Sequence, residues 1–203
     1  MLTHFILGFV TSFLGFTPPS MLNLTVGKIF IDENKSSARH FIFGAAIVVF
    51  FQFLLSIVVI SLIHKFPEIL FWIKNVAILV FIYLSFFYLQ KEYASKQKVQ
   101  QICSQKKCFS YGIKLSFINM FAIPFFALVY SFLITKGFIF EGYNYLLTFG
   151  LGTSLGVIAV LSSYVLLIKK METSVARIMV FFNPLMSIIT GFLAVLTIIK
   201  LYF

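Results

Sequence analysis

The feature that constrains this chain most is a series of long apolar runs that recur along almost its whole length. Each run holds about 20 residues or more, which is the length a helix needs to cross roughly 30 Å of hydrocarbon at about 1.5 Å per residue. The runs occupy residues 4–30, 39–63, 67–90, 110–135, 143–168 and 177–202. They predict an all-α integral membrane protein with six transmembrane helices.

The composition agrees with a chain that faces lipid. Hydrophobic residues make up 61% of its 203 residues and charged residues 11%, which is more apolar surface than a soluble domain of this length can bury. A net charge of +10 would suggest nucleic acid in a soluble protein. Here the basic residues fall mostly between the apolar runs, where anionic lipid headgroups and membrane topology account for them. We therefore expect the lipid bilayer as a partner and no nucleic acid.

A polar linker divides the chain into two similar halves. Residues 91–109 are rich in Lys and Gln and separate three apolar runs in residues 1–90 from three in residues 110–203. With an odd number of helices each, the halves enter the membrane from opposite sides, as do the inverted repeats of many secondary transporters. The pattern Gly-x-x-x-Ser-Phe occurs at residues 8–13 and again at 112–117, and a proline helix breaker follows each copy. The chain is therefore predicted to form two inverted three-helix repeats.

The basic residues of the connections predict the orientation in the membrane, because short connections with excess Lys and Arg stay in the cytoplasm. One side carries Lys28, Lys35, Arg39, Lys91, Lys96, Lys98, Lys106, Lys107, Lys114, Lys169, Lys170 and Arg177. The other side carries only Lys65, Lys74, Lys136 and Lys200. We therefore expect a multi-pass protein of the cell inner membrane with a basic cytoplasmic linker and both termini non-cytoplasmic.

Two consecutive prolines lie near the middle of the first apolar run. A proline inside a helix removes a backbone hydrogen bond at a cost of about 3 kcal/mol, and it pushes the preceding residue away from helical angles. We expect the helix to break there and to free carbonyl groups, which in transporters line a water-filled cavity near the bilayer midplane. Polar residues gather around this break and around the matching part of the fourth run. The candidate substrate-binding and translocation residues are Thr17, Pro18, Pro19, Ser20, Asn23, Gln52, Ser116, Asn119 and Pro124. The alternative is that these side chains only join helices by hydrogen bonds.

The sequence lacks the residue patterns that common catalytic, cofactor-binding and metal-binding sites require. There is no P-loop, no Gly-x-Ser-x-Gly, no His-Glu-x-x-His and no carboxylate pair within a run, so we expect neither an enzyme nor a bound cofactor. A metal site is not expected either, because His4, His40 and His64 all lie near the ends of runs. Cys103 and Cys108 lie in the linker, where a reducing cytoplasm favours free thiols.

Some short stretches carry a resemblance to a known family. They are Thr17 to Thr25, Lys35 to Arg39 with Gly44, Phe109-x-x-Gly112 with Asn119, Ile123-Pro124-Phe125-Phe126, and Gly191-Phe192-Leu193. Together they resemble the LysE-type family of amino-acid exporters, which includes the lysine exporters and the homoserine/threonine efflux proteins. The family's Pro-Gly-Pro is replaced here by Pro18-Pro19-Ser20, and the Asn of its Asn-Pro by Ile123. The resemblance implies transport of an amino acid.

The expected function is therefore a secondary transporter that exports an amino acid or similar small polar metabolite by alternating access. A homo-oligomer is compatible with this expectation. The alternatives are a divalent-metal exporter, a thiol-redox membrane protein of related layout, and a non-transporting membrane scaffold. The redox alternative needs cysteines within the first and fourth runs, which contain none. A scaffold gives no reason to break helices at mid-depth.

Overall fold

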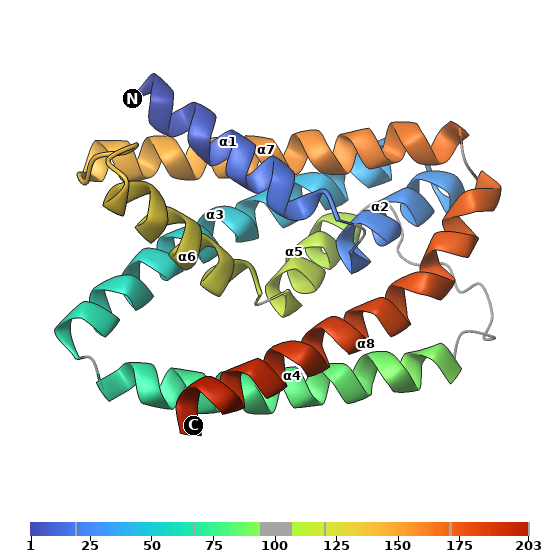
Figure 1. Ribbon diagram of the computed structural model, residues 1–203. Helices are drawn as coiled ribbons and strands as arrows, with labels where there is room; N and C mark the ends of the chain where they lie inside the picture. The colour runs from blue at the N-terminus through green and yellow to red at the C-terminus, as the bar shows by residue number, and fades with distance from the viewer. Residues whose placement is uncertain (19, 67, 94–106, 120, 171, 203) are drawn as a thin grey trace. The chain divides into compact units, whose positions relative to one another are not determined.

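The computed structural model describes residues 1–203 except 19, 67, 94–106, 120, 171 and 203. All regular structure in the described residues is α-helical, which confirms the all-α prediction (Figure 1). The helices are α1 (Leu2–Phe16), α2 (Met21–Asp32), α3 (Lys35–Lys65), α4 (Glu68–Tyr93), α5 (Cys108–Ile118), α6 (Ala122–Thr135), α7 (Tyr143–Lys170) and α8 (Glu172–Tyr202). Each apolar run thus corresponds either to one long helix or to a pair of shorter ones.

Two runs form bent pairs. Helices α1 and α2 are bent by 80° at a short break, and α5 and α6 by 65°. Each bent pair is followed by two long helices, so the same element order occurs twice along the chain. The division into two inverted half-repeats stays a prediction.

Several helices are long and apolar enough to cross a membrane. Among the described residues, α3 and the part of α7 from Tyr143 to Leu167 are each long and apolar enough to cross a membrane, and there are up to four spans if each bent pair crosses as one. Helices α4 and α8 contain shorter apolar stretches, Phe71–Phe87 and Ser187–Leu201. Six spans remain a prediction.

Helix α3 illustrates why these helices suit lipid. Its buried face contains small and aromatic residues together with Gln52 and Ser56. Its exposed large apolar residues lie about one turn apart and are Phe43, Ile47, Phe51, Leu55, Val58 and Leu62. A helix that is apolar outside and carries its polar groups inside has the reverse of the pattern expected in water.

The chain forms two compact units, and each takes helices from both predicted halves. One unit contains Met1–Ile60 and Gln101–Met171, and the other contains Ser61–Gln100 and Glu172–Phe203. The first unit therefore holds α1, α2, most of α3, and α5 to α7, whereas the second holds α4 and α8. The predicted halves, residues 1–90 and 110–203, refer to a repeat within the sequence and not to these compact units. They remain a prediction.

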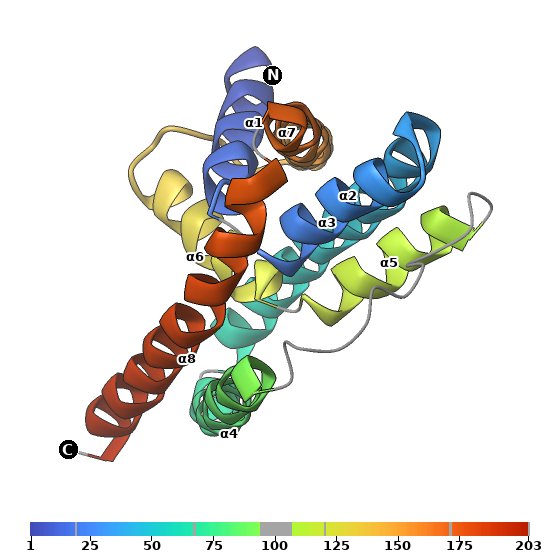
Figure 2. The ribbon, with the colours of Figure 1, turned by 90° about the vertical axis from the view of Figure 1, so that its right-hand side faces the viewer.

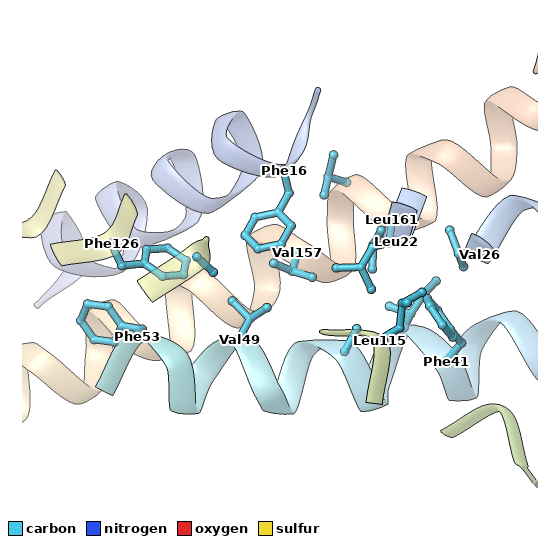
Figure 3. Packing of buried hydrophobic residues seen from close by; sticks show 14 of the residues in the cluster. Phe16, Leu22, Val26, Phe41, Val49, Phe53, Leu115, Phe126, Val157 and Leu161 are labelled. Carbon is cyan, nitrogen blue, oxygen red and sulfur yellow. The ribbon is translucent and has the colours of Figure 1, made fainter. Parts of the chain in front are cut away.

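The first unit has one continuous apolar core. Helix α1 lies beside α7 in both views (Figures 1 and 2), and α2 also contacts α7 and α5. Figure 3 shows Phe126 of α6 close to Phe53 of α3, and their ring centroids are 5.9 Å apart in an edge-to-face arrangement. Phe149 of α7 stacks on Phe53 from 5.0 Å. This aromatic cluster joins three helices close to the α5–α6 break.

In the second unit, α4 packs along α8. Ser85 Oγ donates to the Ser187 carbonyl oxygen at 3.0 Å, and Ser187 Oγ donates to the Ser85 carbonyl oxygen at the same distance. Gly191 lies next to Ser85, since an added Cβ would be 3.1 Å from its Oγ. Small residues and reciprocal hydroxyl bonds are the usual means by which helices associate in lipid.

Candidate functional site

The α1–α2 break lies where the double proline predicts it. Helix α1 ends at Phe16, Pro18 has no N–H to continue the helix, and α2 begins at Met21. Ser20 caps α2 in an extended conformation and accepts a hydrogen bond from the Asn23 N–H at 3.4 Å. Pro19 lies outside the described residues.

The carbonyl groups freed at this break are bound by protein side chains. The fully buried Asn23 donates from Nδ2 to the Phe16 oxygen at 2.8 Å and to the Pro18 oxygen at 2.9 Å. Tyr164 of α7 donates its hydroxyl to the Thr17 oxygen at 2.7 Å. The break is therefore hydrogen-bonded within the protein rather than left open to a ligand.

The other candidates at this break have local partners. Thr17 Oγ1 donates to the Phe13 carbonyl oxygen at 2.6 Å, one turn earlier in α1. Ser20 Oγ donates to Asn23 Oδ1 at 3.1 Å. All three heteroatoms of the Asn23 and Ser20 side chains are thereby engaged.

At the α5–α6 break, a side chain from another helix binds the backbone. Helix α5 ends at Ile118, with Asn119 as its cap, and α6 begins at Ala122. Gln52 of α3 is 5% exposed, and its Nε2 donates to the Ser116 oxygen at 3.0 Å and to the Asn119 oxygen at 3.1 Å. The structure thus brings Gln52, Ser116 and Asn119 together, as one cluster of predicted residues.

The two carboxamides differ in one respect. Asn23 Oδ1 has a donor in Ser20, whereas Gln52 Oε1 is buried and has no hydrogen-bond partner among the described residues. A buried acceptor without a donor costs about 1–3 kcal/mol. Gln52 Oε1 is therefore an unsatisfied group at the second break.

The structure also shows where the predicted site residues Ser116 and Pro124 lie. Ser116 is fully buried, and its Oγ donates to the Ala45 carbonyl oxygen of α3 at 3.3 Å. Pro124 is exposed in the first turn of α6, where a missing N–H leaves no helical bond unmade. It follows the break instead of forming it.

Four glycines hold the broken helices against the long ones. An added Cβ at Gly8 of α1 would collide with the Phe149 carbonyl oxygen of α7, and one at Gly152 of α7 would collide with the Phe5 oxygen of α1. The contacts of α5 and α3 are the same: Gly112 faces the Phe41 oxygen and Gly44 faces the Phe109 oxygen. Only glycine lets the two backbones approach this closely.

These contacts follow a repeated pattern in the sequence that the hydrophobic runs and prolines do not indicate. Phe-x-x-Gly begins at Phe5, Phe41, Phe109 and Phe149, once in each of the four helices. In both crossings the glycine of one copy faces the phenylalanine carbonyl of the other. Helix α1 thus pairs with α7 as α5 pairs with α3. The repeated pattern marks the four helices that cross, but not which two of them cross each other.

The two bent pairs also meet each other within the first unit. The Phe16 and Phe126 rings, from α1 and α6, have centroids 6.4 Å apart. An added Cβ at Gly15 would lie 2.5 Å from the Phe125 ring. The end of α1 therefore packs against the first turns of α6, next to both breaks.

The cysteine expectation needs a correction. Cys108 is the first residue of α5, is fully buried and is disulfide-bonded, so it is not the free linker thiol expected. The chain's only other cysteine, Cys103, lies outside the described residues. The expectation of free thiols rested on a reducing environment for the linker.

No group of three or more His, Cys, Asp or Glu side chains among the described residues is arranged to hold a metal ion. Comparison of the chain with protein-family models, with curated proteins and with solved structures found no match. The site has therefore to be interpreted from its own geometry.

Proposed function

We propose that this chain is a secondary membrane transporter that exports an amino acid or a similar small polar metabolite by alternating access. The observation that carries the proposal is the pair of bent helices whose broken backbone is bound by buried carboxamides. In lipid, irregular backbone persists only where protein or a polar cavity satisfies it. Breaks of this kind are where secondary transporters bind polar substrates.

The matched glycine contacts support a six-span inverted repeat as the architecture of this transporter. If residues 1–90 and 110–203 are repeats, then α1 corresponds to α5 and α3 to α7, and the two crossings are equivalent. Each repeat then contributes one bent helix and one long helix to a common bundle. In such an arrangement, one bundle can rock between two equivalent states around a fixed site.

The proposed site residues at the two breaks are Thr17, Pro18, Pro19, Ser20, Asn23, Gln52, Ser116, Asn119 and Pro124. Among them, Gln52 stands out because its oxygen is unsatisfied. The resemblance to LysE-type exporters agrees with an amino-acid substrate, and we propose the inner membrane as the location, with both termini non-cytoplasmic.

The decisive experiment uses the purified full-length protein in proteoliposomes. Vesicles loaded with each labelled amino acid should release at least one of them faster than vesicles without protein, and the same compound should accumulate in a deletion strain fed dipeptides. The double variant Pro18→Ala, Pro19→Ala is the matched control. If no amino acid is released or accumulated, this transport function is wrong.

A thiol-redox function is a second candidate, because Cys108 is disulfide-bonded at the start of α5. The double variant Cys103→Ser, Cys108→Ser separates the candidates. Undiminished amino-acid release by this variant would leave the disulfide a purely structural role, whereas loss of release without loss of folded protein would favour redox chemistry.

A further inference from the structure

The orientation of the Gln52 carboxamide is determined by its two acceptors. Nε2 donates to the Ser116 and Asn119 carbonyl oxygens of α5. Rotating the amide by 180° would place Oε1 against these two oxygens, with three acceptors facing one another and no proton between them. Oε1 therefore lies on the side of the amide away from the carbonyls that Nε2 binds.

A buried hydroxyl of the same helix, that of Ser56, does not serve Oε1. Ser56 lies one turn after Gln52 and is fully buried, but its Oγ donates its proton to the Phe53 carbonyl oxygen at 2.6 Å. Asn23, the matching carboxamide at the other break, receives its donor from Ser20. Gln52 Oε1 has none among the described residues, although Gln52 is 5% exposed. A buried amide oxygen of this kind needs a donor that the described part of the chain does not supply.

The groups around Gln52 favour a donor with a positive charge. The carbonyls that Gln52 binds belong to the last turn and cap of α5, which is the negative end of a helix dipole. An acceptor oxygen beside a helix C-terminus favours a positively charged donor and disfavours a carboxylate.

We propose that Gln52 Oε1, held at the α5–α6 break, accepts a hydrogen bond from the ammonium group of the transported substrate, an inference that rests on the transport function proposed above. The ammonium group supplies the donor and the positive charge at once. The break at Pro18, whose carbonyls Asn23 and Tyr164 already bind, then has a structural role in the substrate path. Gln52 thus determines specificity for amines over anions.

The test measures binding to the full-length protein in nanodiscs, so that it does not depend on transport. The probes are methylammonium, dimethylammonium, trimethylammonium and tetramethylammonium chlorides, with sodium chloride at equal ionic strength. The thermal unfolding midpoint should rise most with methylammonium, rise less as N–H donors are removed, and stay unchanged with tetramethylammonium and sodium. Equal shifts with all five salts would overturn the proposal.

Two variants identify the acceptor. Gln52→Lys retains a donor for the Ser116 and Asn119 oxygens but has no acceptor, so its affinity for methylammonium should fall at least about tenfold, the value of one charge-assisted hydrogen bond. Ser56→Ala, one turn away, should bind as the parent does. Unchanged affinity in Gln52→Lys would refute the assignment, and the methylammonium series decides the matter if this variant does not fold.

The outcomes also separate this inference from the transport function. If the parent releases amino acids from vesicles but shows no preference for methylammonium over tetramethylammonium, the transporter stands and the Gln52 site is wrong. If the preference is present and depends on Gln52 while no amino acid is released, the ammonium site stands and the transport function is wrong.

Discussion

At the scale of single residues, Asn23 and Gln52 provide the same donor group to two helix breaks, but over different distances along the chain. Asn23 binds carbonyls five and seven residues before it, whereas Gln52 binds carbonyls 64 and 67 residues after it. Both amides are buried, and both hold backbone groups that lipid cannot hydrate. The local cap follows from the sequence, whereas the distant one requires α3 and α5 to be packed together.

Replacing Asn23 should destabilise the protein more than removing the Tyr164 hydroxyl. Asn23→Leu leaves two carbonyl oxygens without donors, which should lower the free energy of unfolding by about 2–4 kcal/mol. Tyr164→Phe removes one exposed hydrogen bond and should cost about 1 kcal/mol or less. Unfolding in nanodiscs measures both. Equal losses would mean that Asn23 does not hold the break.

At the scale of elements, the bends and the crossings have separate causes. The 80° bend follows from the prolines, whose effect on a helix can be predicted from the sequence. The close crossings follow from glycines that face carbonyl oxygens of a partner helix. A proline bends the helix that contains it, whereas a glycine allows another helix to cross closely at its position.

Alanine at the crossing glycines should destabilise the protein in a pairwise manner. Gly8→Ala and Gly152→Ala each force α1 away from α7, at a cost of about 1–3 kcal/mol. Because they disturb one crossing, their effects should be less than additive, whereas Gly8→Ala and Gly112→Ala lie in different crossings and should add. Gly191→Ala, which meets only the Ser85 hydroxyl, is the control and should cost less. Thermal unfolding of the single and double variants gives these energies, and additivity of Gly8→Ala with Gly152→Ala would contradict the pairing.

Removing the double proline should reduce export more than folding. In Pro18→Ala, Pro19→Ala, α1 can continue toward α2, which removes the bend that brings Phe16 and Pro18 to Asn23. We expect membrane insertion to persist and efflux to fall at least about tenfold, an estimate from the cost of misplacing binding groups. Parental efflux by the double variant would show that the bend only serves packing.

At the scale of the whole molecule, two observations disagree about orientation. The excess of Lys and Arg in and around the linker predicts that residues 91–109 are cytoplasmic. The disulfide at Cys108 is more typical of an oxidising compartment. We retain the charge-based orientation, because the basic residues are spread over three connections and the disulfide is a single feature.

Labelling of intact cells with an impermeant maleimide decides the orientation. In a background with Cys103→Ser and Cys108→Ser, the exposed Thr3→Cys should be labelled from outside, and Ser95→Cys in the linker should be labelled only after permeabilisation. Permeabilised cells control for reactivity at both positions. The opposite pattern would invert the topology and would agree with an oxidising environment for the linker.

The amino-acid sequence by itself determined the helical class, the limits of the apolar segments, the α1–α2 break and the repeated element order, because propensity, proline geometry and hydrophobic length act within a few turns of the chain. Only the tertiary structure decided which helices cross and which groups bind the freed carbonyls. Gln52 reaches residues more than 60 positions away, Tyr164 binds a carbonyl 147 positions earlier, and α1 pairs with α7 instead of with its neighbours. These contacts depend on how whole helices fit together, and close packing selects among partners that look equally apolar in sequence.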